Sequence, residues 1–411
     1  MSTVPEQVVK RRVLFVDDEP HILQGLRRML HPYRNEWEMS FAESAHDALG
    51  LMEKQPYDVV VTDIRMPVMD GAEFLNIVMR KYPQTIRFVL SGHCEKETIF
   101  RSVGPTHQFI SKPCDADTLR SLVARAFALR DLMSSGNLKN LVSRLQTLPS
   151  LPDTYTQLMA ELRSADPSIR VIGELVSRDV GMSAKILQLV NSAFFGLRNH
   201  VSSPLQAATL LGTETLRSLV LMTHVFSQVE QAKLPSSFSL EELSRHSMAV
   251  GAVAKAVVKQ ESGDKKLVDD SYMAGLLHDS GKLILATNQP EAYGQVLTEI
   301  AEKRISLEAA ERPVFGATHA EVGAYLLGLW GLPDPIVEAV AFHHAPGQCL
   351  GQRFCPLTAV HIADVLVYEL DSGSGESSEK MDMGYLEALG VQARVGAWRE
   401  LGSRILQEPL R

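Results

Sequence analysis

Short apolar runs that each end at an acid, a hydroxyl or a lysine recur through the N-terminal part of the chain. The runs are residues 13–16, 59–61, 88–90 and 109–110, and apolar residues at helical spacing lie between them. Strands that alternate with amphipathic helices favour a doubly wound parallel sheet of the α/β class. This pattern constrains the fold of the chain more than any other.

The polar residues that follow these runs belong to a small set of chemical types. They are Asp17, Asp18, Asp63, Ser91 and Lys112. Ligands of such sheets bind beyond the carboxyl ends of the strands, so we expect these side chains to converge in one crevice. One carboxylate can accept a phosphoryl group while its neighbours hold Mg²⁺, and a lysine and a hydroxyl can hold the phosphoryl oxygens. The sequence therefore predicts a phosphorylation switch.

The motifs FVDDE, TDIRMPVMDG, LSG and FISKP occur in this order over roughly residues 11–133, which resembles the receiver domain of two-component response regulators. The resemblance implies a five-stranded, flavodoxin-like sheet. It also implies Asp63 as the phosphoacceptor and, with Asp17 and Asp18, as a Mg²⁺ ligand. Ser91 would be the switch hydroxyl and Lys112 the phosphate partner.

Smaller features of the receiver follow from the same resemblance. A backbone carbonyl near Arg65 would complete the Mg²⁺ site, and Lys112-Pro113 would be a cis peptide. Phe109 lies at the aromatic switch position, although plain packing explains an aromatic there equally well. Asp58 is expected only to begin a strand, and Asp115 or Asp117 to cap the last receiver helix.

Bulk composition limits the choice of partners. The chain has 411 residues, a net charge of −8 and a pI near 5.9, without a basic stripe, helix-turn-helix or zinc-finger spacing. We therefore expect two or three domains and no DNA partner. No apolar run approaches the roughly 18 residues of a membrane span, and the N-terminal segment has no apolar signal core, which predicts a cytoplasmic protein. Cysteines without scaffold or metal spacing, expected to be buried reduced thiols, are Cys94, Cys114, Cys349 and Cys355.

Helix signals replace strand signals after the receiver. The segment Ser134-Ser135-Gly136-Asn137 marks a boundary, so we expect a receiver over 11–133, a linker over 134–140 and an all-α output over 141–411. Ser203 and Pro204 should begin a helix that Gly212 closes, and Ser183 should cap another.

The output carries a second constellation of polar residues. They are Glu242, His246, His278, Asp279, Lys282, His319, His343, His344 and Asp364. Glu242 and His246 are one helical turn apart and could face one ion. Mixed imidazole and carboxylate ligands suit Fe, Mn, Zn or Ni, and two or more ions could be held. Such a site activates water and clamps phosphodiester oxygens, whereas any single histidine taken alone is better explained as a core residue.

Residues 246–364 resemble the HD superfamily of phosphohydrolases, with His246, His278-Asp279 and Asp364 as its H…HD…D set. The other ligands, including Glu242, match the fuller set of the HD-GYP branch. The chain departs from that branch after His343-His344, where residues 345–348 contain no Gly-Tyr-Pro turn, so hydrolysis of cyclic di-GMP is not implied.

Over about residues 141–411 the chain resembles the HDOD family of HD-related output domains. The marks are LPSLP at 148–152, the stretch 179–193, LLG at 210–212, HDSGK at 278–282, WGLP at 330–333 and the paired histidines. Asn191-Ser192 could line a groove or simply end a helix. Lys282 could contact a phosphate or be an exposed lysine near a helix end.

Together these features predict a response regulator. Phosphorylation of Asp63 would control a metal-binding HDOD output that acts as a signalling and protein-interaction module. The alternative is a metal-dependent HD-type phosphohydrolase acting on a nucleotide or cyclic dinucleotide. The expected partners are a cognate sensor histidine kinase and a downstream signalling protein, with a nucleotide ligand under the alternative; homodimers are compatible with the receiver resemblance.

Overall fold

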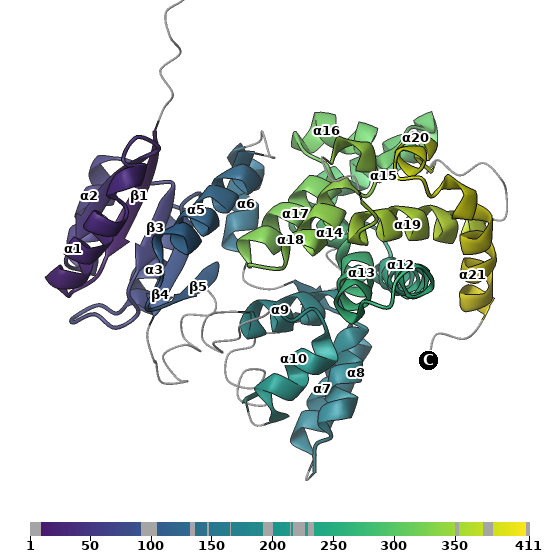
Figure 1. Ribbon diagram of the computed structural model, residues 1–411, viewed down its shortest axis with the longest axis horizontal. Helices are drawn as coiled ribbons and strands as arrows, with labels where there is room; N and C mark the ends of the chain where they lie inside the picture. The colour runs from purple at the N-terminus through teal and green to yellow at the C-terminus, as the bar shows by residue number, and fades with distance from the viewer. Residues whose placement is uncertain are drawn as a thin grey trace, which may run out of the picture. The chain divides into compact units, whose positions relative to one another are not determined.

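The computed structural model describes most of the chain in two compact units (Figure 1). The described residues are 10–91, 105–131, 136–145, 148–164, 166–191, 200–213, 215–216, 227–228, 234–349, 353–372 and 381–407. The first unit consists mainly of Met1–Ala128, and the second mainly of Thr147–Asn191 and Leu197–Arg411.

A parallel five-stranded sheet forms the centre of the first unit. Its strands are β1 (Arg11–Val16), β2 (Trp37–Ala42), β3 (Val59–Thr62), β4 (Ile86–Ser91) and β5 (Gln108–Ser111), in the order β2-β1-β3-β4-β5. This confirms the predicted sheet. Every residue of β3 is buried, whereas only the two ends of β2 are, because β2 lies at the edge. The missing apolar run explains why the sequence pattern did not reveal β2.

Helices between the strands complete the receiver fold. They are α1 (Pro20–Met29), α2 (Ala45–Lys54), α3 (Gly71–Lys81) and α5 (Ala116–Asp131), with a 3₁₀ turn η1 (His31–Tyr33). Asp115 rather than Asp117 is the residue that accepts a hydrogen bond from the Thr118 amide at the start of α5. Asp58 accepts the Arg12 amide at 2.8 Å, as expected of a residue that begins a strand.

Helix α6 (Gly136–Arg144) begins within the segment that we expected to be a linker. Its C-terminal half belongs to the first unit, which includes Lys139–Gln146. There the buried guanidinium of Arg87, on β4, donates to the Ser143 carbonyl at 2.5 Å and to the Pro105 carbonyl at 2.6 Å. The carbonyls of a last helical turn lack intrahelical donors, so Arg87 caps α6.

Among its described residues the second unit is helical, as predicted, apart from a two-residue parallel pair, β6 (Pro149–Ser150) with β7 (Ser227–Gln228). Its N-terminal helices are α7 (Pro152–Arg163), α8 (Ile169–Ser177), α9 (Val180–Val190) and α10 (Pro204–Leu211). They are followed by α12 (Leu240–Glu261), α13 (Lys265–Leu277), α14 (Ser280–Asn288), α15 (Pro290–Lys303), α16 (Leu307–Phe315), α17 (His319–Leu329), α18 (Asp334–Phe342), η4 (Pro346–Gln348), α19 (Pro356–Ser372), α20 (Met383–Ala388), η5 (Gln392–Arg394) and α21 (Val395–Gln407).

The helix ends of this unit test three predicted caps. Ser203 caps α10 with Pro204 in its first turn, and Gly212 ends it at a φ of 76°, as predicted. The prediction that Ser183 caps a helix is wrong. Asp179 caps α9 through the Met182 amide, and Ser183 lies inside α9, where its hydroxyl donates to the Val176 carbonyl at 2.7 Å.

Close helix packing brings distant parts of the output together. Helix α12 packs on α13 and α19, α14 packs on α17, and α17 packs on α18. At Gly281 a Cβ atom would overlap the His319 carbonyl, so only glycine lets α14 and α17 begin side by side. This packing gathers the ends of α13, α17 and α18 in one region of the unit (Figure 1).

Two predictions from composition can also be compared with the structure. No helix among the described residues is long and apolar enough to cross a membrane. Cys114, Cys349 and Cys355 form no disulfide with one another and are half-buried rather than buried, and Cys94 lies outside the described residues.

Candidate phosphoacceptor site and metal centre

The residues after the receiver strands converge at one edge of the sheet. Lys112, after β5, donates to Asp17 Oδ2 at 2.7 Å and to Asp63 Oδ1 at 2.5 Å. Asp63, after β3, also accepts the Arg65 amide at 2.9 Å through Oδ2. Asp17, after β1, is almost fully buried, while Asp63 keeps 13% of its side chain exposed. Of the two carboxylates that contact Lys112, Asp63 is therefore the more accessible.

Opposing effects set the charge state of this cluster. Burial raises the pKa of Asp63, and Lys112 opposes that rise through a hydrogen bond and its positive charge. Burial lowers the pKa of Lys112, but Asp17 and Asp63 outweigh it and raise that pKa overall. Lys112 therefore stays protonated between the two carboxylates. The carboxylate oxygens here are of the type that Mg²⁺ prefers.

The remaining receiver residues take the places expected from the strand pattern. Asp18 is half-buried next to Asp17, Ser91 ends β4 beside Ser111 of β5, and Phe109 is a half-buried residue of β5. Lys112-Pro113 is a cis peptide, as expected. The side chain of Ser91 lies outside the described residues, and the roles of these residues stay predictions.

Seven of the predicted metal ligands of the output lie close together. Three sets of ligand atoms have all members within 4.8 Å of one another: His246, His278 and Asp364; His278, Asp279 and His343; and His319, His343 and His344. Asp279 lies between the outer two sets, because its Oδ2 is 3.3 Å from His278 Nε2 and its Oδ1 is 3.4 Å from His319 Nε2. This arrangement resembles a carboxylate that bridges two cations.

Two of these histidines are oriented by the same local device. His278 follows α13 and His343 follows α18, each as the C-cap residue. His278 Nδ1 lies 2.7 Å from the Gly275 carbonyl, and His343 Nδ1 lies 2.9 Å from the Val340 carbonyl. These carbonyls belong to last turns and need donors, so each ring donates from Nδ1 and turns its Nε2 atom toward the centre.

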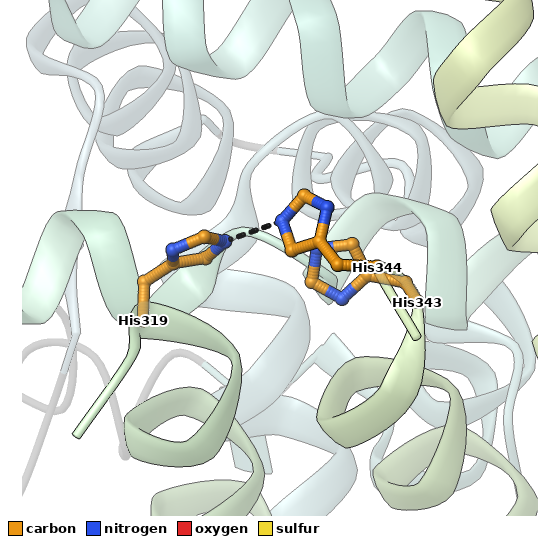
Figure 2. Close-up of side chains that lie close together, drawn as sticks. All are labelled: His319, His343 and His344. Carbon is orange, nitrogen blue, oxygen red and sulfur yellow. Dashed lines mark hydrogen bonds between the residues drawn. The ribbon is translucent and has the colours of Figure 1, made fainter. Parts of the chain in front are cut away.

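Figure 2 shows how α17 and α18 present their histidines to each other. His319, the first residue of α17, points across to His344, and their Nε2 atoms are 3.0 Å apart. His343 lies beside His344, with ring centroids 3.9 Å apart. The three rings therefore converge from two helix ends.

Buried polar atoms without partners point to the chemistry of the centre. Among the described residues, His278 Nε2, His343 Nε2 and Asp279 Oδ1 are buried and make no hydrogen bond. An unpaired buried polar atom costs roughly 1–3 kcal/mol, so several in one cluster need an explanation. A transition-metal ion accepts lone pairs from these atom types, and the residues present fit such an ion.

Neighbouring charges keep the carboxylates of the cluster ionised. Burial would raise the pKa of Asp279, but His278 and Lys282 hold it well below its usual range. The pKa of Asp364 is likewise held far below its usual value, against burial, by His246 and His278. Burial lowers the pKa of His343 strongly. Burial would lower the pKa of His278, but Asp279 and Asp364 raise it to about 10. The cluster therefore combines two ionised carboxylates with a protonated His278 and a neutral His343.

A pocket of about 460 Å³ opens beside this centre. His246, Asp279 and Lys282 line it together with Glu242, Arg245 and three aromatic residues, Phe238, Tyr293 and Tyr368. Lys282 is buried, and its Nζ donates to Asp279 Oδ2 at 2.6 Å, so the interpretation of Lys282 as an exposed lysine is wrong. Glu242 lies on the pocket wall but in none of the three sets of close ligand atoms, so its metal role stays a prediction.

Sequence reasoning missed several residues of this region. Glu311 is fully buried and accepts from His319, whereas His361 contacts the His343 carbonyl through Nδ1 at 2.7 Å. His361 lies one helical turn before Asp364, a spacing that could have drawn attention to it. No sequence pattern indicated a role for Glu311.

Asn191 ends α9 by pairing with the Val201 backbone, which supports the helix-ending interpretation; Ser192 lies outside the described residues.

Comparison with known proteins agrees with the geometry of both sites. Residues 13–124 match the response regulator receiver domain, and residues 148–346 match the HDOD domain. The chain therefore has the architecture of a response regulator: a receiver domain followed by an HDOD output domain. A receiver domain implies a phosphodonor such as a histidine kinase, receiver domains generally bind Mg²⁺, and HD domains bind metals.

Individual relatives each match part of the chain. An uncharacterized protein of Treponema pallidum is 29% identical over 209 residues, which cover 50% of this chain and 39% of that protein. The hydrogenase transcriptional regulatory protein HoxA of Cupriavidus necator is 33% identical over 162 residues, covering 39% of this chain and 33% of HoxA. The chain thus spans well under half of either relative. The crystal structure of the MmoQ response regulator from Methylococcus capsulatus matches with a TM-score of 0.46 and 22% identity, covering 61% of this chain and 97% of that one.

Proposed function

We propose that the output of this response regulator is a metal-dependent phosphohydrolase that phosphorylation of Asp63 regulates. One observation carries the proposal: the Asp279 carboxylate lies between two sets of imidazoles, and the pocket opens onto Asp279 and His246. A carboxylate shared by two metal positions and exposed to a ligand pocket is typical of hydrolytic centres. A purely structural metal site is usually closed.

The ligand residues fall into two positions. His246, His278 and Asp364 would hold one ion, His319, His343 and His344 would hold the other, and Asp279 would contact both. Bound there, Mn or Fe ions, for example, would activate water and neutralise phosphoryl oxygens. Lys282 donates to Asp279 Oδ2, while Oδ1 makes no hydrogen bond among the described residues, so Lys282 keeps the shared carboxylate in position.

The pocket lining supports a phosphate ester as the substrate class. Arg245 and Lys282 contribute positive charge, and Phe238, Tyr293 and Tyr368 offer rings against which an apolar or aromatic alcohol portion can pack. The His246 ring already packs on Tyr368 with centroids 4.6 Å apart. Cyclic di-GMP is not among the expected substrates, because the sequence lacks the Gly-Tyr-Pro segment after the paired histidines.

Regulation begins at the receiver. A sensor histidine kinase would phosphorylate Asp63, with Asp17 and Asp18 holding Mg²⁺ and Lys112 and Ser91 binding the phosphoryl oxygens. The phosphoryl group acts only through its different interaction energy with receiver states that already exist. The Lys112 ammonium is the described group best placed to respond, because it already contacts Asp63.

The experiment compares purified full-length variants. Wild type loaded with Mn²⁺ or Fe²⁺ should hydrolyse bis-p-nitrophenyl phosphate or p-nitrophenyl phosphate. Asp279→Asn should abolish turnover, while Asp269→Asn, a change at a half-buried acid of α13, should retain it. Acetyl phosphate should change turnover in wild type and not in Asp63→Asn. A metal-loaded wild type that hydrolyses neither ester would refute the proposal.

A second candidate is the protein-interaction module. The observation that favours it is the exposure of apolar side chains on two packed helices, α8 and α10: Val171 is 39% exposed, Leu205 39% and Leu210 44%. Exposed apolar residues that cluster are common at binding surfaces. Absence of turnover with an intact metal centre would favour this candidate, with a downstream signalling protein as the partner.

A further inference from the structure

The two metal positions differ in the charge that their own ligands supply. The position formed by His246 and His278 includes the carboxylate of Asp364. The position formed by His319, His343 and His344 has three imidazoles and no carboxylate except the shared Asp279. A divalent ion in a buried site needs compensating negative charge. A further anion close by would therefore stabilise an ion at the imidazole-rich position.

Glu311 of α16 is placed to supply that charge. Its side chain is fully buried, and Oε2 lies 2.8 Å from His319 Nδ1 and accepts the His319 backbone amide at 2.8 Å. Within the described part of the chain, the only basic group that pairs with this carboxylate is His319. Its other oxygen, Oε1, is buried and makes no hydrogen bond among the described residues. A buried carboxylate in this condition is unfavourable unless a cation is nearby.

We propose that Glu311 is the positioning residue of the imidazole-rich metal position, acting through His319. Its carboxylate accepts the Nδ1–H of His319, which directs the Nε2 lone pair toward His344 and the shared Asp279. The negative charge also makes that lone pair a stronger ligand and compensates the ion. His278 and His343, in contrast, take their orientation from uncharged backbone carbonyls. Glu311 thus makes the two positions chemically unequal.

A purely structural role would use the same contacts. Glu311 also accepts the backbone amide of His319 and so anchors the start of α17. That role affects folding stability and treats both metal positions alike. The proposed role affects one position only. The inference rests on the metal centre of the proposed function but does not require turnover.

The test is a chelator-competition titration of Mn²⁺ into the full-length protein. Wild type should bind in two steps, and Glu311→Gln, which keeps the size and an acceptor oxygen, should lower the affinity of one step by about 10–100-fold. Glu308→Gln, a change at a half-buried acid of the same helix, should leave both steps unchanged. Asp364→Asn should weaken the other step. If Glu311→Gln does not fold, Glu311→Asp retains the charge and should weaken the same single step.

A double-mutant comparison tests whether Glu311 acts through His319. In a His319→Gln background, Glu311→Gln should cause no further loss of affinity, because the intermediary is already gone. Three results would overturn the inference: wild-type affinities in Glu311→Gln, equal weakening of both steps, or fewer than two metals in wild type. Two bound metals in wild type without ester hydrolysis would refute the proposed function and leave this inference standing.

Discussion

Replacing Gly275 by alanine should disrupt the metal centre from a distance. Gly275 of α13 faces Gly251 of α12, and a Cβ atom at Gly275 would lie 2.7 Å from the Gly251 Cα and 2.8 Å from its nitrogen. Both neighbours are backbone atoms, so no flexible side chain can move aside. The crossing also sets the distance between two ligands, because His246 is on α12 and His278 follows α13.

The size of the effect follows from this contact. Ordinary carbon contacts begin near 3.4 Å, so α12 and α13 must separate by about 0.7 Å (3.4 − 2.7). Overpacking of this kind costs roughly 1–3 kcal/mol, and the better helix propensity of alanine returns about 1 kcal/mol. We expect a net loss of up to about 2 kcal/mol in the free energy of unfolding. The same shift moves His246 away from His278.

Thermal unfolding and metal titration measure the two consequences. The melting temperature of the helical unit should fall by up to about 8 °C, since 1 kcal/mol corresponds to roughly 2–4 °C at this size. The Mn²⁺ affinity of the His246 position should fall as well. Gly396→Ala is the matched control, because no atom lies within 4 Å of a Cβ at that helical glycine, and it should be neutral or slightly stabilising. Unchanged melting and metal binding in Gly275→Ala would show that the crossing does not position the ligands.

Three further predictions concern other parts of the chain. Asp63→Asn should remove the change in hydrogen exchange that acetyl phosphate produces in wild type; an equal response in both proteins would exclude Asp63 as the acceptor. Arg87→Met should leave the Ser143 and Pro105 carbonyls without this donor, costing roughly 1–3 kcal/mol and speeding exchange at the end of α6; unchanged exchange would mean that the cap is unimportant. Burial lowers the pKa of Lys185 to about 7, so between pH 7 and its unfolded pKa of 10.5 the unfolded chain binds more protons and stability rises with pH. Lys185→Met should therefore be more stable than wild type at pH 7, with a gap that shrinks by about 2 kcal/mol by pH 9, and a constant gap would contradict this.

The receiver shows what strand patterning can and cannot predict. Asp17, Asp63 and Lys112 each follow a strand of the same parallel sheet, so their convergence is a consequence of topology that the sequence already implies. Strand β2 escaped notice because an edge strand needs only a partly apolar surface. The sequence pattern also did not predict that Arg87 would cap α6 at Ser143. A tertiary contact between a strand and a distant helix end leaves no periodic signal.

The candidate metal centre likewise contains residues that the sequence revealed and residues that it did not. The HD resemblance grouped the histidines and acids of the output, and the structure brings seven of the eight predicted ligands close together. Glu311 was not visible, because its role depends on how α16 and α17 are placed and not on any spacing along the chain. Ser183 was misassigned for a related reason: Asp179, four residues earlier, is an equally good cap, and burial of all of α9 decided between them.

Contacts within the output orient the imidazole rings of the centre. His278 and His343 are held by carbonyls of their own helix ends, and His319 by Glu311, all within the helical unit. Phosphorylation of the receiver therefore has no need to assemble the metal ligands. It can only shift the balance among states of the output that already exist. It follows that metal affinity should be the same with and without acetyl phosphate. We expect phosphorylation to change access to the pocket beside His246 instead, which a change in the apparent KM of ester hydrolysis, with unchanged metal content, would report.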